Sequence, residues 1–266
     1  MEVNPLKFRS TGILFSTVCL LALLASLCLI VPTALAGPLP LAEDLSETLT
    51  LRYDESDPDS PSFEYSYVFP RADESDPTAY LINEYYDYQV RDTADFTFPI
   101  LADYYRETGM PASIRITYEV TCNNDEYLSV LLKHEETFDG MTTLIWEGHV
   151  FSRLHGVPGS TYTLPELLGF LSADENDSWL EERQTAKADA LIRETVWQQI
   201  RENPVSVPYY EDLTWEAFSS FFIPEEDFYL DETGNPVFFL QPGAAAPESA
   251  GLLTFPLSIE DILDEM

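Results

Sequence analysis

The chain has 266 residues, of which 47 are acidic and 13 are basic, and its formal net charge at pH 7 is −34. A surface of this kind repels phosphate groups and anionic lipid headgroups, which argues against nucleic acid and anionic membranes as partners. It favours cationic partners, which it attracts in a salt-dependent way. The alternative, which the charge by itself favours, is that the acidic surface only keeps an exported protein soluble.

Residues 1–36 have the order of features found in an export signal. Lys7 and Arg9 precede an unbroken apolar run of 20 residues, Gly12 to Val31, and Ala34-Leu35-Ala36 supplies small residues where a signal peptidase cuts. A run of about 20 residues is also long enough to span a membrane. We therefore predict a signal peptide cleaved after Ala36, with a membrane anchor as the alternative. Both versions place the rest of the chain outside the cytoplasm.

The remaining 230 residues suit one large domain or two small ones. Without Glu2, Lys7 and Arg9 they hold 46 acids and 11 bases, which gives a net charge of −35. Cys122 is their single cysteine, so no intrachain disulfide can form and the core must hold the fold together.

The first part of this chain is predicted to mix strands and helices. Residues 37–44 are interpreted as a linker and residues 45–111 as an N-terminal αβ subdomain. Alternating apolar side chains predict strands over 49–53 and 63–69. Asp76 and Pro77 have the chemistry of a helix N-cap and first helical residue, and a second helix is expected over 98–106.

The second part, residues 112–266, begins with three strands and continues with helices. The dipeptide Asp139-Gly140 predicts a tight hairpin between the second and third of these strands. Strands are expected over 113–122, 127–138, 142–153, 228–230, 237–240 and 252–255, and helices over 164–170, 179–202, 211–221 and 259–263. The order strands, helices, then strands, without β-α-β alternation, predicts an α+β fold built from antiparallel sheets with packed helices.

Cys122 is the first residue that could carry chemistry. Apolar residues alternate along this strand from Ile114 and Ile116 to Cys122, which places the thiol on the apolar face. A buried, inert thiol is therefore expected rather than a nucleophile.

Two carboxylate-rich loops share one pentapeptide, Asp54 to Pro58 and Asp73 to Pro77, which raises the possibility of a calcium site. A strand of about 3.3 Å per residue separates the loops by roughly 20 Å, so they cannot share one ion. They are interpreted as solvated turns and, at Asp76, a helix cap.

The three histidines are His134, His149 and His155. None has the helical His spacing of a zincin motif, and the chain contains no nucleophile elbow, phosphate loop or dinucleotide fingerprint. The sequence therefore assigns no catalytic residue, no cofactor-binding residue and no metal ligand.

Several stretches give the chain a resemblance to a known family. They are Ile82-Asn83, Ile114 to Val120, Tyr127 to Leu132, Tyr162 to Leu168, Asp227 to Phe239, Gln241 to Gly243 and Ala246 to Gly251. Together they resemble the extracellular domain of the anti-sigma factor RsiV and related exported bacterial domains of unknown function. This resemblance implies an α+β fold and a lysozyme-binding surface.

Two departures from the family pattern limit what the resemblance implies. The family often has a Gly-Gly-Ala-His-like turn where this chain has residues 135–140. About ten residues precede the apolar run, which is too short for a helical sigma-binding segment. We therefore expect a non-enzymatic binder of a cationic, lysozyme-like protein or another envelope ligand, without sigma control. The alternative is a cell-envelope hydrolase that uses acidic residues, with or without a metal.

Overall fold

The computed structural model describes residues 37–170, 178–202 and 207–266. The predicted signal peptide or anchor, residues 1–36, lies outside the described residues. Within the described ranges no helix is both long and apolar enough to cross a membrane.

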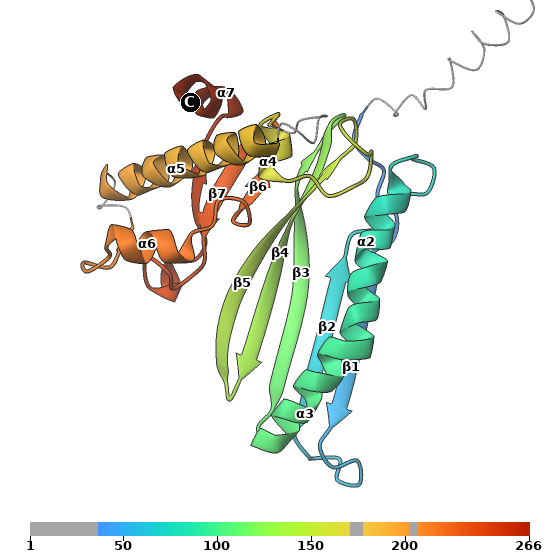
Figure 1. The fold of residues 1–266 in the computed structure, drawn as a ribbon. Coiled ribbons are helices and arrows are strands. Elements are labelled where there is room, and N and C mark those ends of the chain that lie inside the picture. The colour runs from blue at the N-terminus through green and yellow to red at the C-terminus, as the bar shows by residue number, and fades with distance from the viewer. Residues whose placement is uncertain (1–36, 171–177, 203–206) are drawn as a thin grey trace, which may run out of the picture.

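A five-stranded sheet with the strand order β1-β2-β3-β4-β5 forms the larger layer (Figure 1). Its strands are β1 (Leu45–Arg52), β2 (Ser62–Phe69), β3 (Ala112–Asn123), β4 (Tyr127–Phe138) and β5 (Met141–Ser152). β1–β2, β3–β4 and β4–β5 pair antiparallel, which confirms the predicted meander over β3 to β5. β2 and β3 are parallel, so the sheet is mixed rather than wholly antiparallel.

The parallel pair exists because a helical crossover carries the chain from β2 to β3, a β-α-β unit that the sequence analysis missed. The crossover consists of α2 (Ala79–Asp92), a π-helical turn η1 (Thr93–Thr97) and α3 (Phe98–Thr108). The predicted helix start at Pro77 is wrong by two residues, since Thr78 is the N-cap. Asp76 does not cap the helix; its carboxylate accepts hydrogen bonds from the backbone and side chain of Thr78 and from Arg153.

The core of this layer lies between the sheet and the crossover helices. The alternating aromatic residues, which predict the strand β2, are buried in this core. Phe63 stacks on Phe98 with 5.4 Å between ring centroids, and Phe69 stacks on Tyr86 at 5.3 Å. Large buried aromatic rings supply much of the apolar area that stabilises a layer without disulfides.

A smaller, antiparallel sheet with the order β6-β7-β8 forms a second layer with its own core. Its elements are α4 (Leu164–Leu167), α5 (Ser178–Glu202), α6 (Trp215–Phe221), β6 (Phe228–Leu230), β7 (Pro236–Leu240), η3 (Glu248–Ala250), β8 (Leu253–Pro256) and α7 (Ile259–Glu265). α6 begins four residues later than predicted, because extended Thr214 accepts a hydrogen bond from the Ala217 amide and fixes the start. The two layers confirm the predicted α+β class, whereas the subdomain division at residue 111 stays a prediction.

Candidate functional site, an acidic cleft between the two layers

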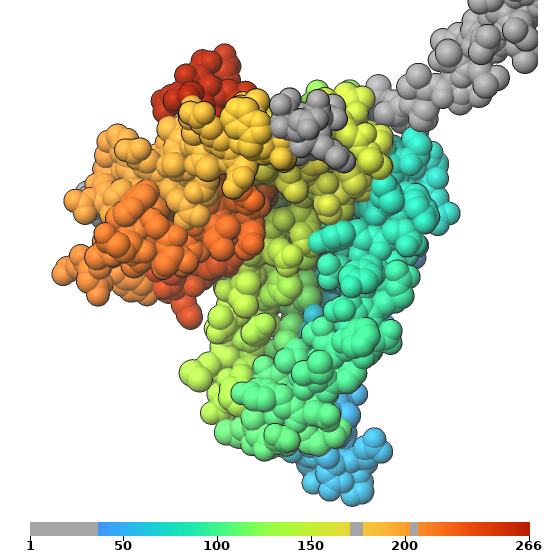
Figure 2. All heavy atoms as spheres, in the orientation of Figure 1, coloured from blue at the N-terminus to red at the C-terminus, as the bar shows by residue number. Residues whose placement is uncertain are grey.

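A cleft of about 480 Å³ opens where the two layers meet. In Figure 2 the surface is hollowed where the yellow-green strand β5, the teal helix α2 and the orange C-terminal layer come together. Its lining comes from four regions of the chain: Tyr85 of α2, residues 145–150 of β5, residues 161–163, and residues 225–228 with Gln241. We call this hollow the acidic cleft, because its charged lining residues are Glu147, Glu225, Glu226 and Asp227.

A glycine allows the two layers to meet at the floor of the acidic cleft. A Cβ atom built on Gly148 would lie 1.8 Å from the Phe228 carbonyl oxygen. No side chain fits in that space, so β5 can approach β6 this closely only at a glycine. Glu147 and Asp227, which immediately precede the two touching residues, are thereby brought to the same cleft.

Gln241 fastens the same junction with a pair of hydrogen bonds. Its Nε2 donates to the Trp146 carbonyl at 2.7 Å, and its Oε1 accepts from the Trp146 amide at 2.9 Å. The side-chain amide thus acts as one more strand residue beside β5. Ser129 adds a buried link, since its hydroxyl accepts from the Leu230 amide at 2.9 Å.

Glu147 connects two histidines on the face of β4 and β5. Its Oε1 lies 2.8 Å from His149 Nε2, and its Oε2 lies 3.6 Å from His134 Nε2. In the register of this hairpin Ile145 lies opposite His134, so Glu147 is a diagonal neighbour on the same face. The nearby imidazole groups of His134 and His149, the latter through a hydrogen bond, hold the pKa of Glu147 well below its usual range, so this carboxylate is ionised at neutral pH.

His149 is 7% exposed and is surrounded by hydrogen-bonding groups. The Tyr86 hydroxyl lies 3.3 Å from its Nδ1, and the Tyr85 hydroxyl lies 3.2 Å from its Nε2. When the ring proton is on Nε2, that atom donates to Glu147 and Nδ1 accepts from Tyr86. This arrangement fixes the ring and orients the Glu147 carboxylate toward the cleft.

The pKa of Asp227 is shifted in the opposite direction from that of Glu147. Burial raises its pKa to about 6, against the hydrogen bond that its Oδ2 accepts from the Ile223 amide at 2.7 Å. Near pH 6 this group is therefore divided between its acid and its anion. Among the carboxylates of the cleft, Glu147 is therefore ionised at neutral pH, whereas Asp227 can give or take a proton near pH 6.

The third histidine lies elsewhere. His155 pairs with Glu126 at 3.5 Å beside the aromatic ring of Tyr127, so only His134 and His149 come together. Within the part of the chain that the structure describes, no group of three or more His, Cys, Asp or Glu side chains is placed to hold a metal ion.

Cys122 is buried, and burial raises the pKa of its thiol to about 11, in keeping with the expected inert thiol.

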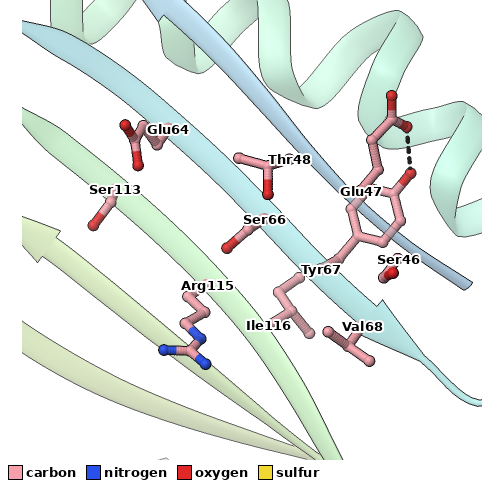
Figure 3. Close-up of a pocket in the computed structure, with 10 residues that line it drawn as sticks. All are labelled: Ser46, Glu47, Thr48, Glu64, Ser66, Tyr67, Val68, Ser113, Arg115 and Ile116. Carbon is pink, nitrogen blue, oxygen red and sulfur yellow. Dashed lines mark hydrogen bonds between the residues drawn. The ribbon is translucent and has the colours of Figure 1, made fainter. Parts of the chain in front are cut away.

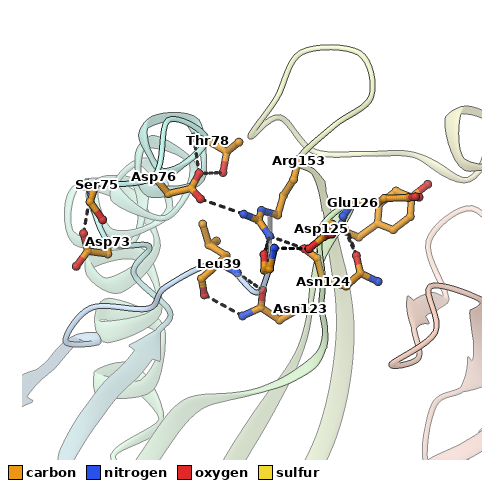
Figure 4. Close-up of polar contacts among 12 residues, drawn as sticks. Leu39, Asp73, Ser75, Asp76, Thr78, Asn123, Asn124, Asp125, Glu126 and Arg153 are labelled. Carbon is orange, nitrogen blue, oxygen red and sulfur yellow. Dashed lines mark hydrogen bonds and ion pairs between the residues drawn. The ribbon is translucent and has the colours of Figure 1, made fainter. Parts of the chain in front are cut away.

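The two repeated acidic loops form turns at opposite ends of β2, as predicted. Asp54 accepts hydrogen bonds from Ser56, and Asp73 accepts one from the Ser75 amide. Asp76 differs from these, because its side chain is fully buried against the fully buried side chain of Arg153. Figure 4 shows Arg153 between the turn that holds Asp76 and the turn between β3 and β4.

A second hollow, of about 660 Å³, lies on the polar face of β1, β2 and β3. Figure 3 shows the short polar side chains of Thr48 and Ser66 and the long, charged side chain of Arg115 on these three strands. They alternate with buried residues such as Tyr65 and Ile114, as expected for a sheet with one wet face. This hollow is a solvated sheet surface and lacks the paired, differently titrating carboxylates of the acidic cleft.

The fold and the cleft together define an α+β domain with an acidic, histidine-containing cleft between two layers. Neither a scan of protein-family models nor a search of curated proteins finds a match to the sequence.

Two solved structures are similar to the chain. A member of the DUF3298 family from Bacteroides fragilis has 13% sequence identity and a TM-score of 0.49, over 85% of this chain and 94% of that chain. A DUF3298 family protein from Pseudomonas aeruginosa has 13% identity and a TM-score of 0.42, over 85% and 93% of the two chains. These structural neighbours belong to a bacterial domain family of unknown function, so they assign no activity. A specific relation to RsiV stays a prediction.

Proposed function

We propose that this chain is an exported bacterial domain that binds a basic protein at the acidic cleft, and that a lysozyme-like protein is the best candidate partner. The domain is secreted, or tethered through residues 1–36, depending on cleavage after Ala36. The observation that carries the proposal is the charge of the cleft lining: four carboxylates and no lysine or arginine.

Charge and shape both support a cationic protein rather than a small ligand. The cleft is open, and Glu225 and Glu226 are exposed at its rim. Rim carboxylates steer a basic partner and raise its association rate, an effect that salt weakens. The net charge of −35 over residues 37–266 adds a long-range attraction of the same sign.

The test is calorimetric titration with lysozyme at low and at high salt. The double variant Glu225→Gln, Glu226→Gln should weaken binding at low salt by about five- to thirtyfold, since each rim charge contributes about 0.5–1 kcal/mol. A matched control removes two exposed carboxylates from the distant β1–β2 loop, Glu55→Gln and Asp59→Asn. Equal losses in both double variants would show attraction to overall charge alone, and no binding at low salt would refute the lysozyme proposal.

The second candidate is a cell-envelope hydrolase. Most enzymes that cleave glycosidic bonds use two carboxyl groups with pKa values shifted in opposite directions, one as the acid and one as the base or nucleophile. Asp227 would donate a proton to the leaving oxygen, and ionised Glu147 would act as the base or nucleophile.

Mass spectrometry of soluble peptidoglycan fragments incubated with the protein at pH 5–6 tests this alternative. Products should form with the unaltered chain, and both Asp227→Asn and Glu147→Gln should abolish them. Absence of any product with the unaltered chain would dismiss the hydrolase while leaving the binding proposal intact.

A further inference from the structure

The segment that follows the predicted cleavage site is bound to the fold from its first residue. The Gly37 amide donates to the Asp125 carboxylate, and the Gly37 carbonyl accepts a hydrogen bond of 2.6 Å from Arg153 Nη1. Two residues on, the Asn123 side chain accepts from the Leu39 amide at 2.6 Å and donates to the Leu39 carbonyl at 3.0 Å. Leu39 itself is 2% exposed. The predicted linker is therefore packed against the fold at Gly37 and Leu39.

The arginine that binds the Gly37 carbonyl is itself held by the rest of the fold. Arg153 is fully buried, pairs with Asp76 at 3.0 Å and also donates to the Asn124 carbonyl. Asp125 belongs to the same turn between β3 and β4. Figure 4 shows this turn and Arg153 gathered around the incoming segment near Leu39. The position of Gly37 is thus set by contacts far away in the sequence.

The backbone of Gly37 has a conformation that only glycine adopts easily, with φ at +115°. This angle is defined by the preceding peptide group, so it constrains residue 37 only while residue 36 is attached. Once the bond before Gly37 is cut, that restriction disappears and the amide nitrogen becomes an ammonium group. An ammonium facing a carboxylate forms a stronger hydrogen bond than a neutral amide does.

We propose that Gly37 is the first residue of the mature protein and that its new α-ammonium group binds the Asp125 carboxylate. The inference rests on the export part of the proposed function. A signal peptidase hydrolyses the Ala36–Gly37 bond: the hydroxyl of water goes to the Ala36 carbonyl carbon and the proton to the Gly37 nitrogen, which then takes up a second proton. Asp125 and Arg153 thereby form a binding site for the new terminus. The Asp125 carboxylate binds the ammonium group of Gly37, and the Arg153 guanidinium binds the carbonyl oxygen of Gly37.

The first experiment is N-terminal sequencing and intact-mass measurement of the full 266-residue chain after secretion from a bacterial host. The expected terminus is Gly37. An uncut chain, or a terminus at any other residue, would overturn the proposal.

The second experiment compares chains that begin at Gly37 and at Ala36. Asp125→Asn should lower the melting temperature of the Gly37 chain by about 2–4 °C at pH 6.5. The effect of the substitution should fade toward pH 10. The Asp125 carboxylate raises the pKa of the α-ammonium group, and above that raised pKa the group loses its proton and its charge. The same substitution should matter less, and independently of pH, in the Ala36 chain, and Asp59→Asn is the control for loss of an exposed carboxylate.

Gly37→Ala further distinguishes the chain that keeps residue 36 from the chain that begins at residue 37. In the Ala36 chain it forces an alanine to positive φ and should lower the melting temperature, whereas in the chain beginning at residue 37 it should have little effect. Equal effects of Asp125→Asn, or of Gly37→Ala, in both chains would contradict the proposal. None of these measurements involves a ligand, so they stand apart from whether the acidic cleft binds a basic protein.

Discussion

The buried ion pair between Arg153 and Asp76 gives the sharpest stability prediction. Both side chains are fully buried and 3.0 Å apart, and Arg153 also donates to the carbonyls of Gly37 and Asn124. Arg153→Met removes the cation and leaves a buried carboxylate without its charge partner. Breaking a buried pair from one side costs about 3–5 kcal/mol. A domain of this kind has about 5–15 kcal/mol of unfolding free energy in total, so the loss is a large fraction.

Urea unfolding at pH 7, followed by circular dichroism, measures this loss. With a slope of about 2–3 kcal/mol per molar urea, the midpoint should fall by about 1–2.5 M. The matched control is Arg71→Met, which breaks a half-exposed pair with Asp87 at 3.1 Å and should cost about 0–1 kcal/mol. If Arg153→Met shifted the midpoint no more than Arg71→Met, the account of the buried pair would be refuted.

The same pair predicts an acid-range pH dependence. Burial raises the pKa of Asp76, but hydrogen bonds from Thr78 and the charge of Arg153 outweigh it and leave the pKa below its ordinary value. A carboxylate with a depressed folded-state pKa adds stability above its unfolded pKa of about 3.9, and this stability is lost as pH falls through the folded value. The loss of stability below about pH 4 should therefore be shallower in Arg153→Met than in the unaltered chain.

Three further predictions concern the acidic cleft and the core. Gly148→Ala places a methyl group against the Phe228 carbonyl and should cost at least about 1–3 kcal/mol in urea unfolding; an unchanged midpoint would show that the layers do not touch there. Asp227→Asn removes a carboxylate whose pKa burial raises to about 6, so it should raise stability at pH 7.5 and change little at pH 4. A gain of the same size at both pH values would argue against burial as the cause. The buried thiol of Cys122, with its pKa raised to about 11, should resist a thiol reagent at pH 8 until urea unfolds the chain; rapid labelling of the folded protein would contradict its placement.

The contact of His134 and His149 with Glu147 is contained in the local sequence pattern. The two-residue turn Asp139-Gly140 sets Phe138 opposite Met141, and every later pairing of β4 with β5 follows from that register. Counting back from the turn places His134 diagonally opposite Glu147, and His149 lies two residues from Glu147 on the same face. The hairpin turn thus fixes which side chains meet across β4 and β5.

Other parts of the fold required long-range information that local patterns do not contain. The parallel pairing of β2 with β3 depends on where the 79–108 crossover packs, and the alternating patterns of the two strands are compatible with either direction. The role of Asp76 was also beyond local rules. Its sequence context fits a helix cap, and only the fold brings in Arg153, 77 positions away.

One packing contact brings together two carboxylates, Glu147 and Asp227, whose pKa values shift in opposite directions for different reasons. Gly148 and the Phe228 carbonyl are the point of closest approach between β5 and β6, so the residues just before them lie at the margin of the junction. Glu147 lies beside two histidines, of which His149 hydrogen-bonds to it, and keeps half of its side chain exposed, which favours the anion. Asp227 lies deeper, where burial penalises its charge. A shift in how the layers approach each other would therefore change the burial and the protonation of Asp227, and with them the charge that the cleft offers to a basic partner near pH 6.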